Sequence, residues 1–337
     1  MDKKITLLKA LAIMLVVSGH LEFSLIPMFP PYSFQLALFF FISGMLFNEK
    51  YGVFEYIKRR FKSLMLPYFL YSFVYLGITI AITPLIGKFW GMEINWYNEL
   101  VIPFLTGHQL DLTSPLWFVP QLFITLIIYK VFKTKTWVYF VLALIAIQLA
   151  PFRENLYILL TLRTMFSLLF VHLGYLYSKN KPDIFKPQIV YFVILLQSIL
   201  WLTNKDFTPA DGIGLSYILV WGEFDSPIVP ILTSLSGIYL SLLIIEIAYE
   251  HIKNWSFLQK IGQNTYHIMA NHIFVFNIIT YSILAIKGIP FDIKNNADIY
   301  WFYYPLKTTY FYFIAGIIFT TYFGEFLKYI KSLSKRA

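Results

Sequence analysis

Long apolar segments recur along almost the whole chain, and they constrain its fold more than any other feature of the sequence. A bilayer core about 30 Å thick needs roughly 20 apolar helical residues, and a backbone in lipid must satisfy its own hydrogen bonds. Only 13% of the residues are charged, against about 25% in soluble domains. We therefore predict an all-α, polytopic transmembrane helical bundle of about 10 spans, forming one integral-membrane domain over residues 1–337 with no soluble domain. The expected spans cover residues 5–23, 32–48, 64–87, 115–132, 136–150, 156–178, 187–203, 228–250, 265–286 and 301–328.

The distribution of Lys and Arg gives the predicted bundle an orientation. Cytoplasmic loops are enriched in these residues, and an even number of spans places both termini on one side. With the N-terminus inside, the basic connections around Lys58, Lys133 and Lys253 fall on the cytoplasmic side, and the opposite connections carry few basic residues. We therefore predict that both termini are cytoplasmic. The net charge of +9 follows from the same asymmetry, so nucleic-acid binding is not expected.

The first apolar segment is expected to be a retained helix. It is long, it contains His20 and Glu22, and it lacks the small-residue cleavage site of a secretory signal peptide. The chain has no cysteine, which excludes disulfides, thiolate metal sites and an acyl-cysteine intermediate. The stretch 212–221 is apolar but too short to cross a bilayer, so we expect a surface or re-entrant element there.

Ionisable side chains within the predicted spans are the candidate functional residues. A central lysine costs roughly 2.5–3.5 kcal/mol on insertion scales, so a chain that keeps such groups has usually put them to use. Lys9 and His20 share the first segment, roughly 16 Å apart along a helix axis. Arg163 and Lys307 are expected at the same outer depth as His20. A purely structural interpretation stays open: snorkelling explains Lys9, and Lys9 with Glu246 would make a packing pair.

The residue types indicate acid–base and anion chemistry. Histidine titrates near neutrality and can accept and return a proton, which fits His20 as a catalytic group. Arg and Lys in a low-dielectric site can stabilise an oxyanion, which fits Arg163 and Lys307. The basic run 58–62 is a candidate phosphate site, although a positive-inside loop explains it as well. The sequence contains no glycine-rich phosphate loop and no zinc-ligand spacing, so no metal is expected.

Several short motifs resemble the membrane acyltransferase-3 family of bacterial O-acyltransferases. The family opens with an arginine, ten residues and a histidine, and this chain has Lys9, ten residues and His20. Residues 40–44, Phe-Phe-Ile-Ser-Gly, resemble its Phe-Phe-x-x-Ser-Gly signature. The basic run 58–62 leads into a proline and a tyrosine, as the basic loop of the family does.

Two later motifs extend the resemblance over nearly the whole chain. Residues 262–266, Gly-Gln-Asn-Thr-Tyr, lead to His272, like the family's Ser-Leu-x-Ile-Tyr-Leu-x-His. Residues 115–120, Pro-Leu-Trp-Phe-Val-Pro, resemble the branch that acetylates sugars of surface polysaccharides. The order and spacing of these motifs are more specific than any one of them alone.

The chain departs from the family pattern at two positions. Lysine stands at position 9 in place of arginine, so the charge remains while a bidentate clamp is lost. The family's Arg-x-x-Arg pattern, aligned on the proline, falls on Arg60 and Ser63, and Arg59 with Lys62 would have to substitute for it.

The resemblance implies an O-acetyltransferase of the bacterial cytoplasmic (inner) membrane, surrounded by membrane lipid. Acetyl-CoA would be the acyl donor, and a hydroxyl of a cell-surface glycan or its lipid-linked precursor would be the acceptor. His20 would act as general base or as transient acyl carrier. The expected roles are catalytic for His20, Arg163 and Lys307, donor-binding for Lys9, Arg59, Arg60 and Lys62, and substrate-binding for Glu22, Trp117 and His272.

Two other functions fit the same sequence features. A transporter or flippase for a lipid-linked oligosaccharide or a small anion would also place charges inside about 10 spans, although the two halves show no matching broken segments. A non-catalytic relative that acts as a membrane partner is the third interpretation, because Lys9 replaces the family arginine.

Overall fold

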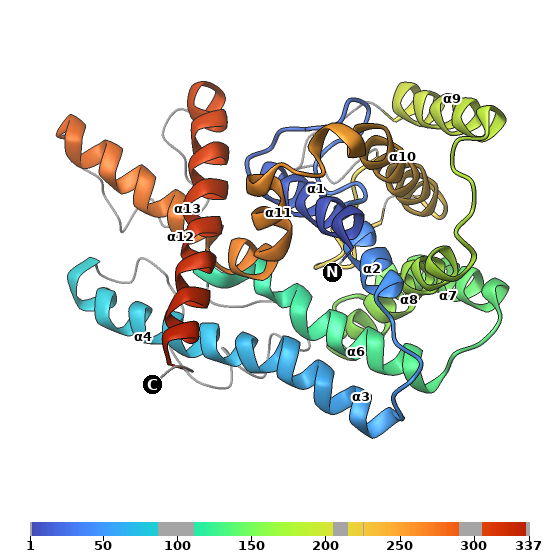
Figure 1. The fold of residues 1–337 in the computed structure, drawn as a ribbon, viewed down its shortest axis with the longest axis horizontal. Helices are drawn as coiled ribbons and strands as arrows, with labels where there is room; N and C mark the ends of the chain where they lie inside the picture. The colour runs from blue at the N-terminus through green and yellow to red at the C-terminus, as the bar shows by residue number, and fades with distance from the viewer. Residues whose placement is uncertain (1, 87–110, 205–214, 225, 290–304, 335–337) are drawn as a thin grey trace.

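The structure, a computed structural model, describes residues 2–86, 111–204, 215–224, 226–289 and 305–334 (Figure 1). Within these ranges the chain forms helices joined by turns, with a single isolated β-bridge between Ile218 and Glu223. The elements are α1 (Lys3–Gly19), α2 (Gln35–Met45), α3 (Val53–Arg60), the π-helical segment η1 (Phe61–Met65), α4 (Leu66–Ile86), η3 (Asp111–Trp117), α6 (Phe118–Val131), α7 (Thr136–Gln148), η4 (Ala150–Phe152), α8 (Leu156–Asn180), α9 (Pro187–Thr203), α10 (Val229–Ile252), α11 (Ser256–Gln263), α12 (Thr265–Lys287) and α13 (Pro305–Leu333).

Six of the described helical stretches are long and apolar enough to cross a membrane. Three further apolar helices, α2, α7 and α9, are shorter. Together with α1, these helices overlap all ten predicted spans, which confirms the all-helical class, whereas the number of crossings and the orientation stay predictions. Residues 87 and 301–304 of the predicted spans lie outside the described residues. The six long stretches are Val53–Ile78, Ser114–Val131, Leu156–Asn180, Val229–Ile252, Thr265–Lys287 and Lys307–Leu333.

The first helix is shorter than the predicted span 5–23. It begins after Asp2, whose side chain accepts a hydrogen bond from the Lys4 backbone N–H, and it ends at Gly19. His20 is the C-cap residue of α1, and the chain then turns at Glu22 with a φ of 58°. The prediction that His20 lies inside a helix is therefore wrong by one residue, and the side chain stands at the exit of α1.

The second predicted span, 32–48, contains an even shorter helix. Prolines at positions 27, 30 and 31 cannot donate backbone hydrogen bonds and keep the preceding chain in turns, so α2 begins only at Gln35. Its 11 residues are about 16 Å long, too short to cross a bilayer core along the normal.

The basic run 58–62 lies in a helix, and the prediction of a loop there is wrong. α3, η1 and α4 follow one another without interruption, because residues 53–66 contain neither glycine nor proline. Pro67 removes one N–H from the helical ladder, and the preceding turn widens into the π-helical η1, where the Leu66 N–H bonds the Phe61 carbonyl.

α1 lies at the centre of the described helices and packs against α2, α10, α11, α12 and α13 (Figure 1). One of its faces, including Leu8 and Leu15, joins a core formed with α2, α6, α7, α8 and α10. Another face, including Ile13 and Val17, joins a second core formed with α4, α12 and α13. The end of α1 that carries His20 therefore lies where two separately packed groups of helices meet.

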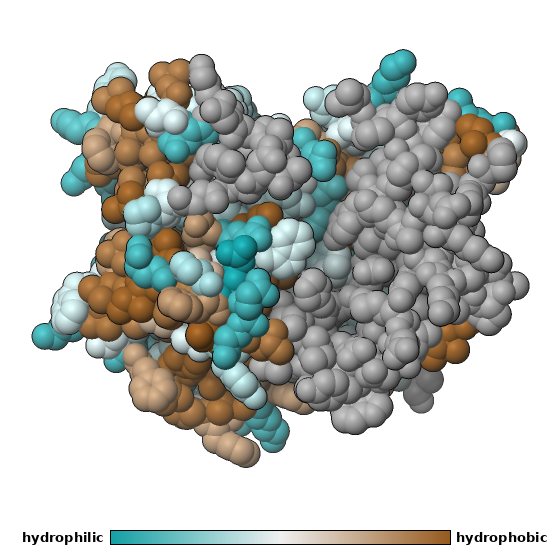
Figure 2. All heavy atoms as spheres, turned by 180° about the vertical axis from the view of Figure 1, so that it is seen from behind, coloured by the Kyte–Doolittle hydropathy of each residue, from teal (hydrophilic) through white to brown (hydrophobic). Residues whose placement is uncertain are grey.

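Large apolar side chains remain exposed along several helices, among them Phe192 and Leu195 of α9 and Phe319 and Phe326 of α13. Apolar residues also cover much of the described surface in Figure 2. A soluble protein rarely leaves so much apolar surface in water, whereas lipid tails cover it at no cost.

The segment 215–224 is largely buried, although Trp221 is exposed. Of the two alternatives expected here, a surface element does not describe the buried residues, and a re-entrant element stays a prediction. Leu215, Tyr217 and Leu219 are each at most 3% exposed. The segment packs inward because Tyr217 donates from its backbone N–H to the Tyr32 carbonyl, which fastens it to the turn that follows α1. Positions 212–214 of the predicted element lie outside the described residues.

Candidate active site

Two of the predicted site residues meet at the end of α1. His20 caps α1 and is half-buried, and His272 lies in α12 with a fully buried side chain. Their ring centroids are 5.1 Å apart and the ring planes are inclined at 45°. Phe276, one turn further along α12, packs edge-on against His272 at 5.7 Å. Packing of α12 against α1 thus brings His272, from the last third of the chain, into contact with His20 near the N-terminus.

The tautomer of His272 follows from its backbone contact. Its Nδ1 lies 2.9 Å from the Ile268 carbonyl oxygen, one helical turn earlier. A carbonyl oxygen only accepts hydrogen bonds, so the neutral ring carries its hydrogen on Nδ1 and a lone pair on Nε2. This Nε2 is buried and has no hydrogen-bond partner among the residues that the structure describes.

Tyr32 is a third member of the site that the sequence reasoning missed. Its hydroxyl lies 3.4 Å from Nδ1 of His20, and its ring meets the imidazole edge-on at 5.9 Å. Tyr32 has a φ of 61°, a left-handed conformation that costs a residue with a side chain roughly 1–2 kcal/mol. The buried segment 215–224 holds it there, because Tyr217 N–H donates to the Tyr32 carbonyl (3.0 Å) and the Ser216 hydroxyl to the Pro31 carbonyl (2.7 Å). The only sequence signal was the adjacent prolines, which predict a turn and not a contact with His20.

Arg163 and Trp117 pair with each other inside the bundle. The Arg163 side chain is 1% exposed, lies 5.2 Å over the Trp117 ring, and donates from Nε to the Leu219 carbonyl at 3.2 Å. Arg163 therefore anchors the segment that holds Tyr32 in place, which is an indirect link to His20. Trp117 is 7% exposed, so its ring is covered by the surrounding protein.

Glu22 and Lys307 lie at the same end of the bundle as His20. Glu22 is exposed in the left-handed turn directly after α1. The next residue, Phe23, packs against Tyr310 and Phe313 of α13, with ring centroids 5.3 Å apart in both pairs. Lys307 is exposed and precedes Tyr310 by one helical turn, which places it near the turn that follows His20.

Three of the predicted donor-binding residues lie at the end of α3 and in the following η1. Arg59 forms an ion pair with Glu55 at 2.7 Å. Arg60 donates to the Leu46 carbonyl at 3.2 Å and lies 5.1 Å from the centroid of the Tyr56 ring. Lys62 is exposed in η1. Arg59 and Arg60 thus already have partners within the protein, and a phosphate would compete with those partners.

Lys9 does not pair with Glu246, so that structural interpretation is wrong. Glu246 accepts a hydrogen bond from Lys4, with Nζ and Oε1 2.6 Å apart. Lys9 is half-buried and lies within electrostatic range of Lys328, another cation, at the end of α13. Two neighbouring cations repel each other, so they favour an anion between them. Lys9 and Lys328 do not lie on α3 or η1, where the other donor-binding residues are.

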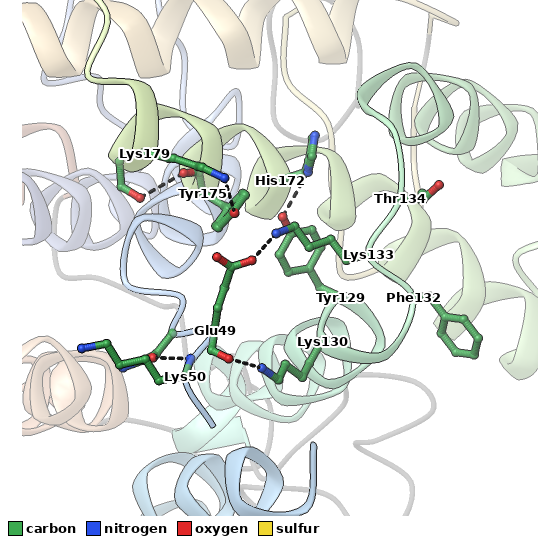
Figure 3. A network of polar contacts seen from close by, with 12 residues as sticks. Glu49, Lys50, Tyr129, Lys130, Phe132, Lys133, Thr134, His172, Tyr175 and Lys179 are labelled. Atoms are coloured by element: carbon green, nitrogen blue, oxygen red, sulfur yellow. Dashed lines mark hydrogen bonds and ion pairs between the residues drawn. The ribbon is translucent and has the colours of Figure 1, made fainter. Parts of the chain in front are cut away.

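A second basic network lies where α2, α6 and α8 end (Figure 3). Glu49 forms an ion pair with Lys133, and its backbone carbonyl accepts from Lys130 at 3.2 Å. Lys133 lies 3.8 Å over the Tyr175 ring, and Lys179 reaches the hydroxyl of the same tyrosine at 3.5 Å. The hydrogen bond from Lys133 lowers the pKa of Glu49, so this carboxylate stays charged and ties together residues that sequence reasoning treated only as loop charge.

No group of three or more His, Asp or Glu side chains in the described ranges could hold a metal ion.

Apolar helices, two adjoining cores and a histidine pair at their junction define a polytopic membrane protein with a buried site suited to acid–base chemistry. The family model for an acyltransferase domain, that of the acyltransferase-3 family, matches residues 2–324. The chain belongs to this family of membrane acyltransferases. No curated protein and no solved structure matches the chain.

Proposed function

We propose that the protein is an O-acetyltransferase that moves an acetyl group from acetyl-CoA to a hydroxyl of a cell-surface glycan or its lipid-linked precursor. The observation that carries the proposal is the pair of imidazole rings of His20 and His272, 5.1 Å apart at the junction of two helix groups. Imidazole is the side chain best suited to receive a hydroxyl proton and return it near neutral pH. Membership in the acyltransferase family supplies the class of reaction.

The donor would enter from the cytoplasmic side of the bacterial inner membrane. Its phosphates would contact Arg59, Arg60, Lys62 and Lys9, which carry positive charge toward the predicted inner face. Coenzyme A is long and anionic at one end, and the roughly 16 Å of helix between Lys9 and His20 suit its extended arm. The thioester would then lie beside His20.

Acyl transfer at this site has two routes through His20. As a general base, His20 takes the proton of the acceptor hydroxyl while its oxygen attacks the thioester carbon, and the carbon–sulfur bond then breaks to release coenzyme A. As an acyl carrier, His20 itself attacks the thioester and passes the acetyl group to the hydroxyl in a second step. Both routes form an oxyanion, and we propose Arg163 and Lys307 as the cations that stabilise it or bind the sugar.

The acceptor would approach from the end of the bundle where Glu22 and Lys307 lie exposed. A carboxylate such as Glu22 can accept hydrogen bonds from two sugar hydroxyls. Arg163 covers one face of the Trp117 ring in this structure, so a sugar could stack on that face only after Arg163 moves.

The proposal is tested with the full-length protein and with cells that lack it. Mass spectrometry of surface glycans should show one acetyl group fewer without the protein, and purified protein should consume acetyl-CoA. The variant His20→Ala should bind acetyl-CoA within about twofold of wild type but transfer acetyl at least about 100-fold more slowly. His251→Ala, an exposed histidine at the end of α10, is the matched control and should keep full activity.

Two results would contradict the proposal. Unchanged glycans together with no consumption of acetyl-CoA would point to the transporter or partner interpretations. Acetyl transfer by His20→Ala at the wild-type rate and at normal expression would show that His20 takes no part in catalysis.

A further inference from the structure

The unpaired lone pair on His272 identifies what kind of ligand atom belongs beside it. Its side chain is 0% exposed, Nδ1 bonds the Ile268 carbonyl, and Nε2 has no partner among the described residues. Leaving such an acceptor unsatisfied costs about 1–3 kcal/mol. The missing group must therefore be a hydrogen-bond donor, an O–H or an N–H.

The open lone pair is particular to His272 and not to buried histidines of this bundle in general. His172, only 3% exposed on α8, has Tyr129 on Nδ1 and Thr136 on Nε2, both at 3.0 Å. His267, five residues before His272 on α12, has the Tyr71 hydroxyl on Nδ1 at 2.6 Å.

Because Nε2 requires a hydrogen-bond donor, the groups of acetyl-CoA and of the acceptor can be compared by whether they carry one. A thioester carbonyl and a phosphate have no hydrogen to donate, so neither satisfies Nε2, whereas an acceptor hydroxyl and an amide N–H of the pantetheine arm both can. Acetyl-CoA binding by the His272 variants described below distinguishes these two donors.

A hydroxyl bound at Nε2 would lie beside the His20 ring, whose centroid is 5.1 Å from that of His272. We propose that His272 binds the acceptor hydroxyl through Nε2 and takes its proton during transfer. The general-base role in the first of the two routes then belongs to His272 in place of His20, and His20 contacts the thioester. This inference rests on the proposed acetyl transfer.

The proposed step balances without another reactant. The hydroxyl proton moves to Nε2 of His272 as the oxygen bonds the thioester carbon, and the carbon–sulfur bond breaks. The imidazolium then gives this proton to the departing coenzyme A sulfur. Throughout, Nδ1 keeps its hydrogen and donates it to the Ile268 carbonyl, which orients the ring and stabilises its positive charge.

A first measurement tests the lone pair without any substrate. Nitrogen-15 NMR of histidine-labelled, full-length protein distinguishes protonated from unprotonated ring nitrogens, and the His272→Gln spectrum assigns the signal. The proposal expects hydrogen on Nδ1 and none on Nε2 in wild type. The opposite tautomer would overturn it, whatever reaction the protein catalyses.

A second measurement uses a pair of variants that separate the two ring nitrogens. In His272→Asn, the amide can replace Nδ1 toward Ile268, as Asn271 and Asn277 already donate to the carbonyls four residues before them at 2.6 and 2.9 Å. His272→Gln instead places a hydrogen-bonding atom near the position of Nε2, but an amide cannot take a proton. His172→Gln is the matched control for replacing a buried histidine with no open nitrogen.

Each variant is expressed in cells lacking the protein, and glycan acetylation is measured at equal membrane levels. We expect both His272 variants to lose at least about 100-fold in acetylation and to bind purified acetyl-CoA within about twofold of wild type. The control should keep its acetylation per folded molecule. Retention of more than about half the activity by either variant, or loss of acetyl-CoA binding by His272→Asn, would overturn the inference. A wild type that acetylates nothing would instead refute the proposed function and leave the NMR result standing.

Discussion

At the scale of single residues, Tyr32, with a strained backbone conformation, orients His20 in the site. Tyr32 adopts a left-handed backbone conformation that non-glycine residues rarely adopt, and strain of this kind persists only where surrounding contacts enforce it. Those contacts are the hydrogen bonds from segment 215–224, which Arg163 in turn anchors through Leu219. The result is a phenol directed at Nδ1 of His20, which fixes the orientation of the imidazole ring.

Removing only the Tyr32 hydroxyl should slow the reaction without unfolding the protein. Tyr32→Phe loses a hydrogen bond worth about 0.5–1.5 kcal/mol, which corresponds to a fall in kcat of up to about tenfold. The unfolding temperature in detergent should stay close to that of wild type. Tyr239→Phe on α10 is the control. It loses the hydrogen bond from its hydroxyl to the Ile184 carbonyl and should keep its kcat. An unchanged kcat in Tyr32→Phe would show that the hydroxyl does not act on His20.

At the scale of elements, glycines at helix crossings explain two of the motifs. A Cβ on Gly44 would lie 2.0 Å from the Val171 carbonyl of α8, and a Cβ on Gly174 would lie 1.9 Å from the Phe41 carbonyl of α2. The two glycines thus let α2 and α8 approach until their backbones touch, as small residues do in membrane helices. Gly262 plays the same part where α11 meets α1, since its Cβ would lie 1.9 Å from the Thr6 carbonyl.

Adding one methyl group at the first crossing should destabilise the bundle. In Gly44→Ala the new Cβ meets backbone, which cannot move aside as a side chain can, so we expect a loss of about 1–3 kcal/mol. Thermal unfolding followed by size-exclusion chromatography in detergent measures it. Gly77→Ala on α4 is the matched control, because its Cβ meets nothing within 4 Å and alanine favours helix. Equal unfolding temperatures for the two variants would contradict the close crossing.

At the scale of the whole molecule, the central question is how many helices cross the membrane. Besides the six long stretches, α7 has 13 residues and measures about 20 Å, less than the hydrocarbon thickness. It can cross only if the bilayer thins locally or if the residues that flank α7 span the remaining thickness. The predicted orientation, with both termini inside, depends on such short helices crossing.

The absence of cysteine makes this question directly testable. Lys135→Cys and Glu154→Cys place one thiol at each end of α7, both at exposed positions. We expect a membrane-impermeant thiol reagent added to intact cells to label only Glu154→Cys, and Lys135→Cys to react only after the cells are opened. The wild type is the blank control. Labelling of both positions from the same side would rule out a crossing by α7 and change the predicted count of spans.

The sequence by itself determined the class of fold and the family, and it predicted site roles for the two histidines that the structure brings together. Apolar segments leave helices as the only way to satisfy the backbone in lipid, and charge asymmetry gives an orientation. These are local or cumulative properties, so they can be read without a tertiary structure. The meeting of His20 with His272, by contrast, could not be predicted, because it depends on how α12 packs on α1.

Only the tertiary structure decided which polar groups have partners. Glu246 bonds Lys4 and not Lys9, and contacts from Arg163 lead through Leu219 and Tyr32 to His20. Nε2 of His272 has no partner among the residues that the structure describes. A hydrogen bond depends on distances of a few tenths of an ångström between residues far apart in the chain, which helix periodicity does not specify. The sequence therefore supplies the chemical groups, and the packing of α1 between its neighbouring helices determines which of them face a substrate.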